Sequence, residues 1–369
     1  MGMFWLPTLI SRCGARARRL GPRVVVAVGL AILLGAAPNQ PARAQDEPSD
    51  LTRLNLRELL GLDVVSVNVL GTHTHLAGQW MVGYEFMFEN MDGNRDGTHR
   101  VSHAKVAETF MSVPVDMTMQ MQMGMLMYAP SDDLSLMAMV KYIRKVMNHV
   151  TVDGGRFREL SEGLGDLELR GFYTAFNVRG YEHRFILAPG ISIPTGSIDK
   201  KDFGPDRSLG RDRLEYPMQL GSGTVDLLPG LAYLGQARDW AWGAEFLPTI
   251  RLGRNSHNYA LGNRYELKGW AARKLTEWLS ISARVDGQLW ENIHGADQTL
   301  VRTDEPGKDP RRQGGERIDM LAGLNFYVPR GPLKGQRLSI EFGAPVYQRL
   351  DGPQLQVDWL ARAAWQWVF

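Results

Sequence analysis

Ionisable side chains stand at every second position in several stretches of this sequence, with apolar residues between them. Around Arg284 and Asp286, for example, Ile, Ala, Val and Leu occupy most of the alternate positions. Because successive side chains of a β-strand point to opposite faces, these charges share one face and the apolar residues share the other. On the inner wall of a barrel, such charges would pair with one another and line a path for solutes.

The residues that we predict to line this path carry both signs of charge. This mixture favours internal ion pairs over a strongly ion-selective pore, and the charges could also serve only to stabilise the wall. The main candidates are Glu85, Lys141, Asp166, Glu168, Arg170, Arg184, Glu245, Arg284, Asp286 and Arg362. The same face of the predicted strands adds Arg251, Glu266, Lys268, Asp319, Glu341 and Asp358.

Methionine is concentrated in one part of the chain, since 13 of the 17 methionines lie between Met81 and Met147. Thioethers are soft ligands that suit Cu(I). A metal site would use His73, His75, Met81, Met87, Met137 and Met139. The alternative is that methionine is a flexible apolar filler. For the column Met117–Met127 we expect packing against lipid, because polar residues such as Asp116 and Gln122 alternate with it.

An enzyme is not predicted. The run Ser256-His257-Asn258 offers the residue types of a hydrolase, but a catalytic triad is built by geometry rather than by adjacency in sequence. The only cysteine, Cys13, precedes the predicted cleavage site described next, so we expect no thiol in the mature protein. No cofactor is expected either.

The first 44 residues have the order of a secretory signal peptide. A basic stretch is followed by the apolar run Val24–Ala37 and then by Ala42-Arg43-Ala44, a small-x-small cleavage site. We therefore expect cleavage after Ala44. Residues 45–78 are expected to form an N-terminal segment that lies in the periplasm or enters a barrel lumen.

Nucleic acid is an improbable partner on charge alone. Residues 1–44 hold six Arg and no acid, so the remaining 325 residues carry 36 Lys+Arg against 40 Asp+Glu. The mature chain is thus mildly acidic, whereas nucleic-acid binding proteins present a basic surface.

Alternation of apolar and polar residues continues from residue 79 to residue 369 and predicts an all-β fold. We expect a transmembrane antiparallel up-and-down barrel of about twelve strands, near 79–89, 117–128, 134–147, 165–178, 182–194, 223–236, 239–252, 263–275, 278–290, 317–328, 337–348 and 355–369. Short connections alternate with longer ones, of which the longest are predicted at 90–114, 148–164, 195–222 and 291–316. This segregation is typical of bacterial outer-membrane barrels, with short turns in the periplasm.

The predicted final strand, Leu355–Phe369, places Trp359, Trp365, Trp367 and Phe369 on one face. A soluble protein seldom leaves such a face on an edge strand, because it invites aggregation. A strand that ends in an aromatic residue resembles the signal read by the barrel assembly machinery. We therefore expect the outer membrane as the location, with membrane lipid and that machinery as partners.

Several segments resemble a known family. GLGDLELRGFY (Gly163–Tyr173) and APGISIPTGS (Ala188–Ser197) are similar to the outer-membrane channel family named for the meta-pathway of phenol degradation. GTHTHLAGQWMVGYEFM (Gly71–Met87) and MYAPSDDLSLMAMV (Met127–Val140) resemble its methionine-rich transporter branch. The resemblance implies a barrel and a channel or transporter for small solutes, with hydrophobic or aromatic compounds suggested by the family name. The alternatives are a copper-associated outer-membrane protein and a structural or lipolytic barrel.

Overall fold

The computed structural model describes residues 71–178 and 182–369, and within them the regular secondary structure is almost entirely β-strand. The strands of the main sheet are β1 (Trp80–Gly97), β2 (His99–Val101), β3 (Ser112–Ser131), β4 (Leu134–Thr151), β5 (Arg156–Leu164), β6 (Leu167–Val178), β7 (His183–Leu187), β8 (Gly190–Ile193), β11 (Val225–Leu227), β12 (Leu231–Ala237), β13 (Trp240–Leu252), β15 (Arg264–Lys274), β16 (Leu279–Trp290), β18 (Gly315–Tyr327) and β19 (Gln336–Val368). The predicted signal peptide and most of the predicted N-terminal segment fall outside the described residues.

Short elements fill the connections at one end of the sheet. They are α3 (His103–Ala107), β9 (Lys201–Phe203), η2 (Arg207–Leu209), β10 (Arg211–Arg213), η3 (Tyr216–Met218), β14 (Tyr259–Ala260), β17 (His294–Gly295), η4 (Pro306–Lys308) and η5 (Pro310–Arg312). Ser102 begins α3, since its side chain accepts a hydrogen bond from the Lys105 backbone N–H. No helix among the described residues is long and apolar enough to cross a membrane.

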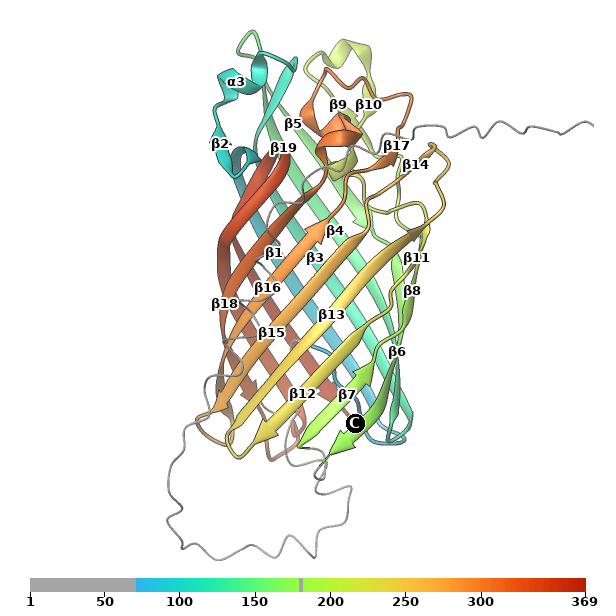
Figure 1. The fold of residues 1–369 in the computed structure, drawn as a ribbon, viewed down its shortest axis with the longest axis vertical. Helices are drawn as coiled ribbons and strands as arrows, with labels where there is room; N and C mark the ends of the chain where they lie inside the picture. Colours follow the sequence, from blue (N-terminus) through green and yellow to red (C-terminus); the bar gives the residue numbers. More distant parts are fainter. Residues whose placement is uncertain (1–70, 179–181) are drawn as a thin grey trace, which may run out of the picture. The chain divides into compact units, whose positions relative to one another are not determined.

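The main sheet closes on itself as an antiparallel barrel, as the alternation predicted (Figure 1). The strand order runs β12, β13, β15, β16, β18, β19, β1, β3, β4, β6, β7 and back to β12. Three passes are interrupted: β5 continues as β6, β8 continues β7, and β12 continues β11. Closure leaves no free edge in the wall, which satisfies the backbone hydrogen bonds that lipid cannot.

The element β19 folds back and crosses the wall twice. Its residues 337–350 pair with β18, and its residues 354–368 pair with β1. Between them the Gln348 side chain bonds both backbone groups of Val357, at 2.8 Å and 3.0 Å, which is impossible along a straight strand. The closed ring has eleven members when β19 is counted once, and the wall therefore has the twelve passes expected from the sequence.

Aromatic side chains stack at two levels on the outer face of the wall. At the end that carries the short turns, Trp80 stacks on Tyr128, with ring centroids 4.6 Å apart. Farther along β1, Phe88 stacks on Trp359 at 5.0 Å. Eight residues of a strand tilted by 35–45° span roughly 20 Å of the barrel axis, close to the ~25 Å apolar band of outer-membrane barrels.

The ends of the strands differ from the predicted boundaries. Residues 90–97 and 148–151, expected in long loops, continue β1 and β4, and much of the expected loop 148–164 forms β5. Beyond the apolar band, both faces of these strands carry polar residues, so the hydrophobic alternation disappears while the ladder continues. Asn148 and Asp116, for example, are bonded across this extension at 2.7 Å.

Candidate functional site

The inner wall of β1, β3 and β4 is lined by methionine, and the prediction that Met117–Met127 face lipid is wrong. Paired residues of neighbouring strands share a face, and Met81 pairs with Met127, which in turn pairs with Met137. Met81 and Met127 are fully buried, whereas Leu126 on the other face is 47% exposed. The odd-numbered column of β3 therefore points into the barrel.

Sequence reasoning missed this lining because the outer face of β3 carries polar residues. Gln120 pairs with Arg144 of β4, at the level of the aromatic stack that Phe88 forms with Trp359. There the outer face meets water rather than lipid, so a polar residue can point outward. The inner-wall methionines of these three strands are Met81, Met87, Met91, Met117, Met119, Met121, Met123, Met125, Met127, Met137, Met139 and Met147.

Next to these strands on the inner wall, β16, β18 and β19 present a network of buried ion pairs. The Arg284 guanidinium meets Glu341 through two nitrogens, at 3.0–3.2 Å. Arg362 reaches Asp286 at 3.1 Å, although the two lie 76 positions apart. A third group joins Arg317 to Glu89 at 2.9 Å and to Asp319 at 3.0 Å.

Most of the predicted lumen residues belong to such groups. Lys141 is ion-paired with Glu168, and Arg170 lies 3.5 Å from the same carboxylate. Asp166 differs: its carboxylate accepts backbone hydrogen bonds from Gly196 and Ser222, so it fastens two loop segments together. The members placed on the inner wall by register or burial are Glu85, Lys141, Glu168, Arg170, Arg184, Glu245, Arg284, Asp286 and Arg362.

The segment that precedes β1 runs through the lumen near the end that carries the short turns. The Thr72 backbone N–H donates to Glu245 of β13, and Arg184 of β7 donates to the Thr74 hydroxyl. The His75 N–H donates to the Ser135 hydroxyl of β4 at 3.0 Å. The segment is thus bound to three strands of the wall, and Glu245 and Arg184 act as its anchors.

A small cavity of about 60 Å³ lies beside this segment, lined by His73, Glu85, Met125, Met127, Met137 and Phe172 together with Gly71 and Gln366. His73 Nε2 lies 3.3 Å from the Met81 sulfur, and its ring packs edge-on against His75. Burial lowers the pKa of His73 to about 4, so the imidazole is neutral at pH 7. The predicted metal set is therefore partly assembled here, with Met127 added.

The remaining two members of the predicted metal set lie farther up the wall. Met139 pairs with Met125, one inward position beyond Met137, and Met87 pairs with Met121, six residues along β1 from Met81. Both face inward, as expected, but Met87 is separated from His73 by about 20 Å of strand. A single ion near His73 cannot be shared by all six residues.

The opposite end of the lumen is narrowed by the loop between β8 and β11. Leu214 and Met218, both fully buried, pack against Met117 and Met147 of the inner wall. Lys145 fixes this loop, because its ammonium donates to the Pro217 carbonyl at 2.6 Å and to the Gln219 carbonyl at 2.8 Å. The lumen is therefore constricted at both ends.

Ser256, His257 and Asn258 do not form a catalytic triad with one another. His257 Nε2 lies 2.7 Å from Asp199 and 2.8 Å from Arg213, so its imidazole belongs to an ion-pair cluster of the loops. Ser256 is exposed to solvent.

A closed antiparallel barrel with an apolar outer face and two aromatic levels defines the class of outer-membrane β-barrel proteins. The chain is similar in structure to an outer-membrane channel from Pseudomonas putida F1, with a TM-score of 0.57 and 13% identity over 81% of this chain and 98% of that one. At this identity the likeness shows the fold alone. The KdgM porin (TM-score 0.35, 11% identity, 78% and 99% covered) and the CymD monoaromatic hydrocarbon channel (0.37, 8%, 83% and 95%) are more distant.

Two other comparisons returned nothing. No family model matches the chain, and no curated protein matches it. The resemblance to the phenol meta-pathway family therefore stays a prediction.

Proposed function

We propose that this protein is an outer-membrane channel for small, largely apolar solutes. The observation that carries the proposal is the inner wall of β1, β3 and β4, where an unbroken column of methionines on β3 is flanked by further methionines of β1 and β4. A water-filled porin presents a polar lining to its solutes. Thioether side chains instead offer a soft, polarisable and adaptable apolar surface, which suits hydrophobic or aromatic compounds.

The charged sector supports the same proposal. One row of the inner wall contains Glu85, Met123 and Lys141 in register on three neighbouring strands. An amphipathic solute could place its apolar part on the methionines and its polar part against Glu85 or Lys141. Export to the outer membrane, assembly through the C-terminal strand and contact with lipid belong to this proposal.

The test is ion selectivity in planar bilayers, supplemented by uptake of a labelled aromatic acid in cells that carry or lack the gene. Lys141→Met removes a positive charge from the wall and should shift the reversal potential toward cations. Glu85→Gln removes a negative charge and should shift it toward anions. A sealed barrel, with neither conductance nor an uptake defect on deletion, contradicts the proposal.

Met320→Leu is the matched control for these lumen variants. Met320 lies on the outer face of β18 and is 49% exposed, and a Met-to-Leu change there preserves apolar contact with lipid. It should leave conductance and selectivity unchanged. A transport change in Met320→Leu, with both lumen variants silent, would mean that the faces are inverted.

A second candidate function is binding of a soft metal ion at the small cavity. The contact between His73 Nε2 and the Met81 sulfur, with Met127 and Met137 on the same cavity, carries it. Thioethers and a neutral imidazole suit Cu(I) or Ag(I). Titration with Ag⁺ tests it, since His73→Ala should abolish binding while His294→Ala, a change at an exposed histidine of β17, should not.

A further inference from the structure

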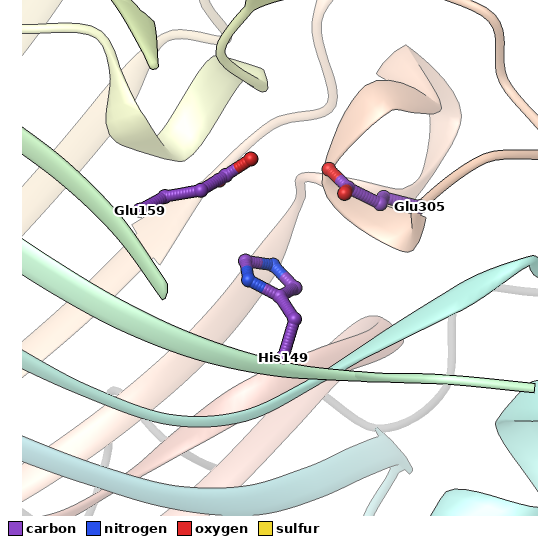
Figure 2. Close-up of side chains that lie close together, drawn as sticks. All are labelled: His149, Glu159 and Glu305. Atoms are coloured by element: carbon purple, nitrogen blue, oxygen red, sulfur yellow. The ribbon is translucent and has the colours of Figure 1, made fainter. Parts of the chain in front are cut away.

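Two buried ionisable side chains of the β4–β5 hairpin meet a third from a distant loop at the end of the barrel that carries the longer loops. His149 comes from the end of β4, Glu159 from β5, and Glu305 from the residue before η4. Figure 2 shows the His149 ring pointing between the two carboxyl groups. One ligand atom from each residue lies within 4.8 Å of the others.

The cluster lies beyond the apolar band of the wall. On the outer face of the same strands, Arg144 and Glu162 form an ion pair at 3.3 Å, and both side chains are almost half exposed. Charges on the outer face mark the level where the strands leave lipid. His149 and Glu159 are farther along toward the β4–β5 turn, so they lie at the level of the surrounding water rather than at the level of lipid.

Four polar atoms of this cluster are buried without hydrogen-bond partners among the described residues. His149 is 1% exposed, and neither of its ring nitrogens has a partner. Oε2 of Glu159 and Oε2 of Glu305 are likewise buried without a hydrogen-bond partner among the described residues. A buried polar atom left unpaired costs about 1–3 kcal/mol, so the arrangement favours a ligand that satisfies several of them together.

Acidic groups outnumber basic ones around these atoms. A third buried carboxyl group, that of Glu215, lies against Gly307 of η4. The nearest compensating charge is Lys308, whose ammonium lies 3.7 Å from Glu305 but is shared with Asp304 at 3.4 Å. A cation between the carboxylates would relieve this excess.

We propose that His149, Glu159 and Glu305 form a binding site for a divalent transition-metal ion of the Zn²⁺ or Mn²⁺ type. One imidazole nitrogen and two carboxylates match the nitrogen and oxygen ligands that these ions accept, at about 2.0–2.2 Å. Ca²⁺ requires six to eight oxygen ligands, and Cu(I) prefers sulfur. The site thus differs in chemistry from the cavity at His73.

Such an ion would join the β4–β5 hairpin to the loop between β16 and β18. Glu305 is already bonded to β3, because the Ser112 hydroxyl donates to its Oε1 at 2.9 Å. The His149 ring is held by stacking on Phe157, with centroids 4.7 Å apart and planes 7° apart. Two of the ligands are therefore oriented by neighbours that the ion does not have to displace.

The test uses the mature protein in detergent, without a polyhistidine tag and stripped with EDTA. Equilibrium dialysis against ZnCl₂, MnCl₂ or CaCl₂, with metal measured by mass spectrometry, should give one equivalent of Zn²⁺ or Mn²⁺ and none of Ca²⁺ at micromolar concentrations. His149→Ala and Glu159→Gln should weaken this binding by more than about 100-fold, since even outer partners of metal ligands contribute 10–100-fold. Co²⁺ should give visible d–d bands that both variants lose.

Matched controls lie on the same elements. Glu162→Gln changes the outward carboxylate of β5, and His294→Ala removes an exposed histidine of the neighbouring loop. Both should keep the bound equivalent, and heat-modifiable migration should confirm that every variant forms the barrel. Absence of bound metal, or an equivalent that survives both ligand variants and is lost in His73→Ala, overturns the proposal. Channel activity does not enter this measurement.

Discussion

Single residues of the inner wall show why charged side chains can be buried inside this barrel. Arg284 and Glu341 are both almost fully buried and meet through a paired geometry at 3.0–3.2 Å. Such geometry offsets the desolvation of both ions, whereas one ion with a neutral partner is left undercompensated. The alternation of residues predicted that both face inward. It could not predict which charges meet, because partners such as Arg362 and Asp286 are brought together only by closure of the barrel.

Glu341→Gln should therefore destabilise the barrel by about 3 kcal/mol, the lower end of the cost of breaking a buried ion pair. Glu277→Gln is its control, because Glu277 and Arg330 form an exposed pair at 3.4 Å, which contributes little. Urea unfolding in lipid vesicles, followed by tryptophan fluorescence, measures both. Equal midpoints for the two variants would show that the buried pair contributes no more than the exposed one.

At the scale of the strands, the sequence predicted that the strands exist and in which order they follow. It predicted less well where each strand ends and which of its faces points into the barrel. Within the apolar band, the contrast between Trp80 or Val82 and Glu85 fixes which face of β1 meets lipid. Between Met117 and Tyr128 both faces of β3 lack charge, and the polar residues of its upper part point to water outside. The rule that polar residues point inward fails there, and with it the prediction for Met117–Met127.

The pairing of neighbouring strands also depends on a glycine that leaves room for a tryptophan ring on the next strand. The sequence alone did not reveal this feature. Gly243 of β13 pairs with the buried Trp270 of β15, and a Cβ on this glycine would lie 2.7 Å from the indole ring. Gly243→Ala should therefore cost about 1–3 kcal/mol through overpacking. Gly287→Ala, where the nearest atom would be 3.6 Å away, should change stability by less than about 0.5 kcal/mol. Urea midpoints compare the two, and a silent Gly243→Ala would mean that the indole moves freely.

For the whole molecule, the two constrictions mean that the narrowest parts of the lumen are set by groups that are not part of the wall. The amino-acid sequence alone is compatible with an N-terminal segment in the periplasm or in the lumen. The residues Thr72–His75 have no sequence feature that predicts a position in the lumen. Their partners Glu245, Arg184 and Ser135 belong to three strands that are distant from them in sequence. Only the folded barrel places those partners around them.

Releasing this segment should raise the single-channel conductance. Ser135→Ala and Asp132→Ala together remove the acceptors of the His75 and Ala77 backbone N–H groups. Asp133→Ala, in the same turn, is the control. If the double variant conducts no better than the control, Thr72–His75 does not limit the path.

The wall is completed where Trp80 and Phe369 exchange backbone hydrogen bonds, each 2.9 Å long. These residues are 289 positions apart, so the ring can close only after every intervening strand has been made. Contacts this distant in sequence form slowly, because the entropy of closing the loop is lost before the contact is gained. Until then β1 and β19 each carry an open row of hydrogen-bonding groups, so we expect assembly of the barrel to be slow compared with synthesis of the chain.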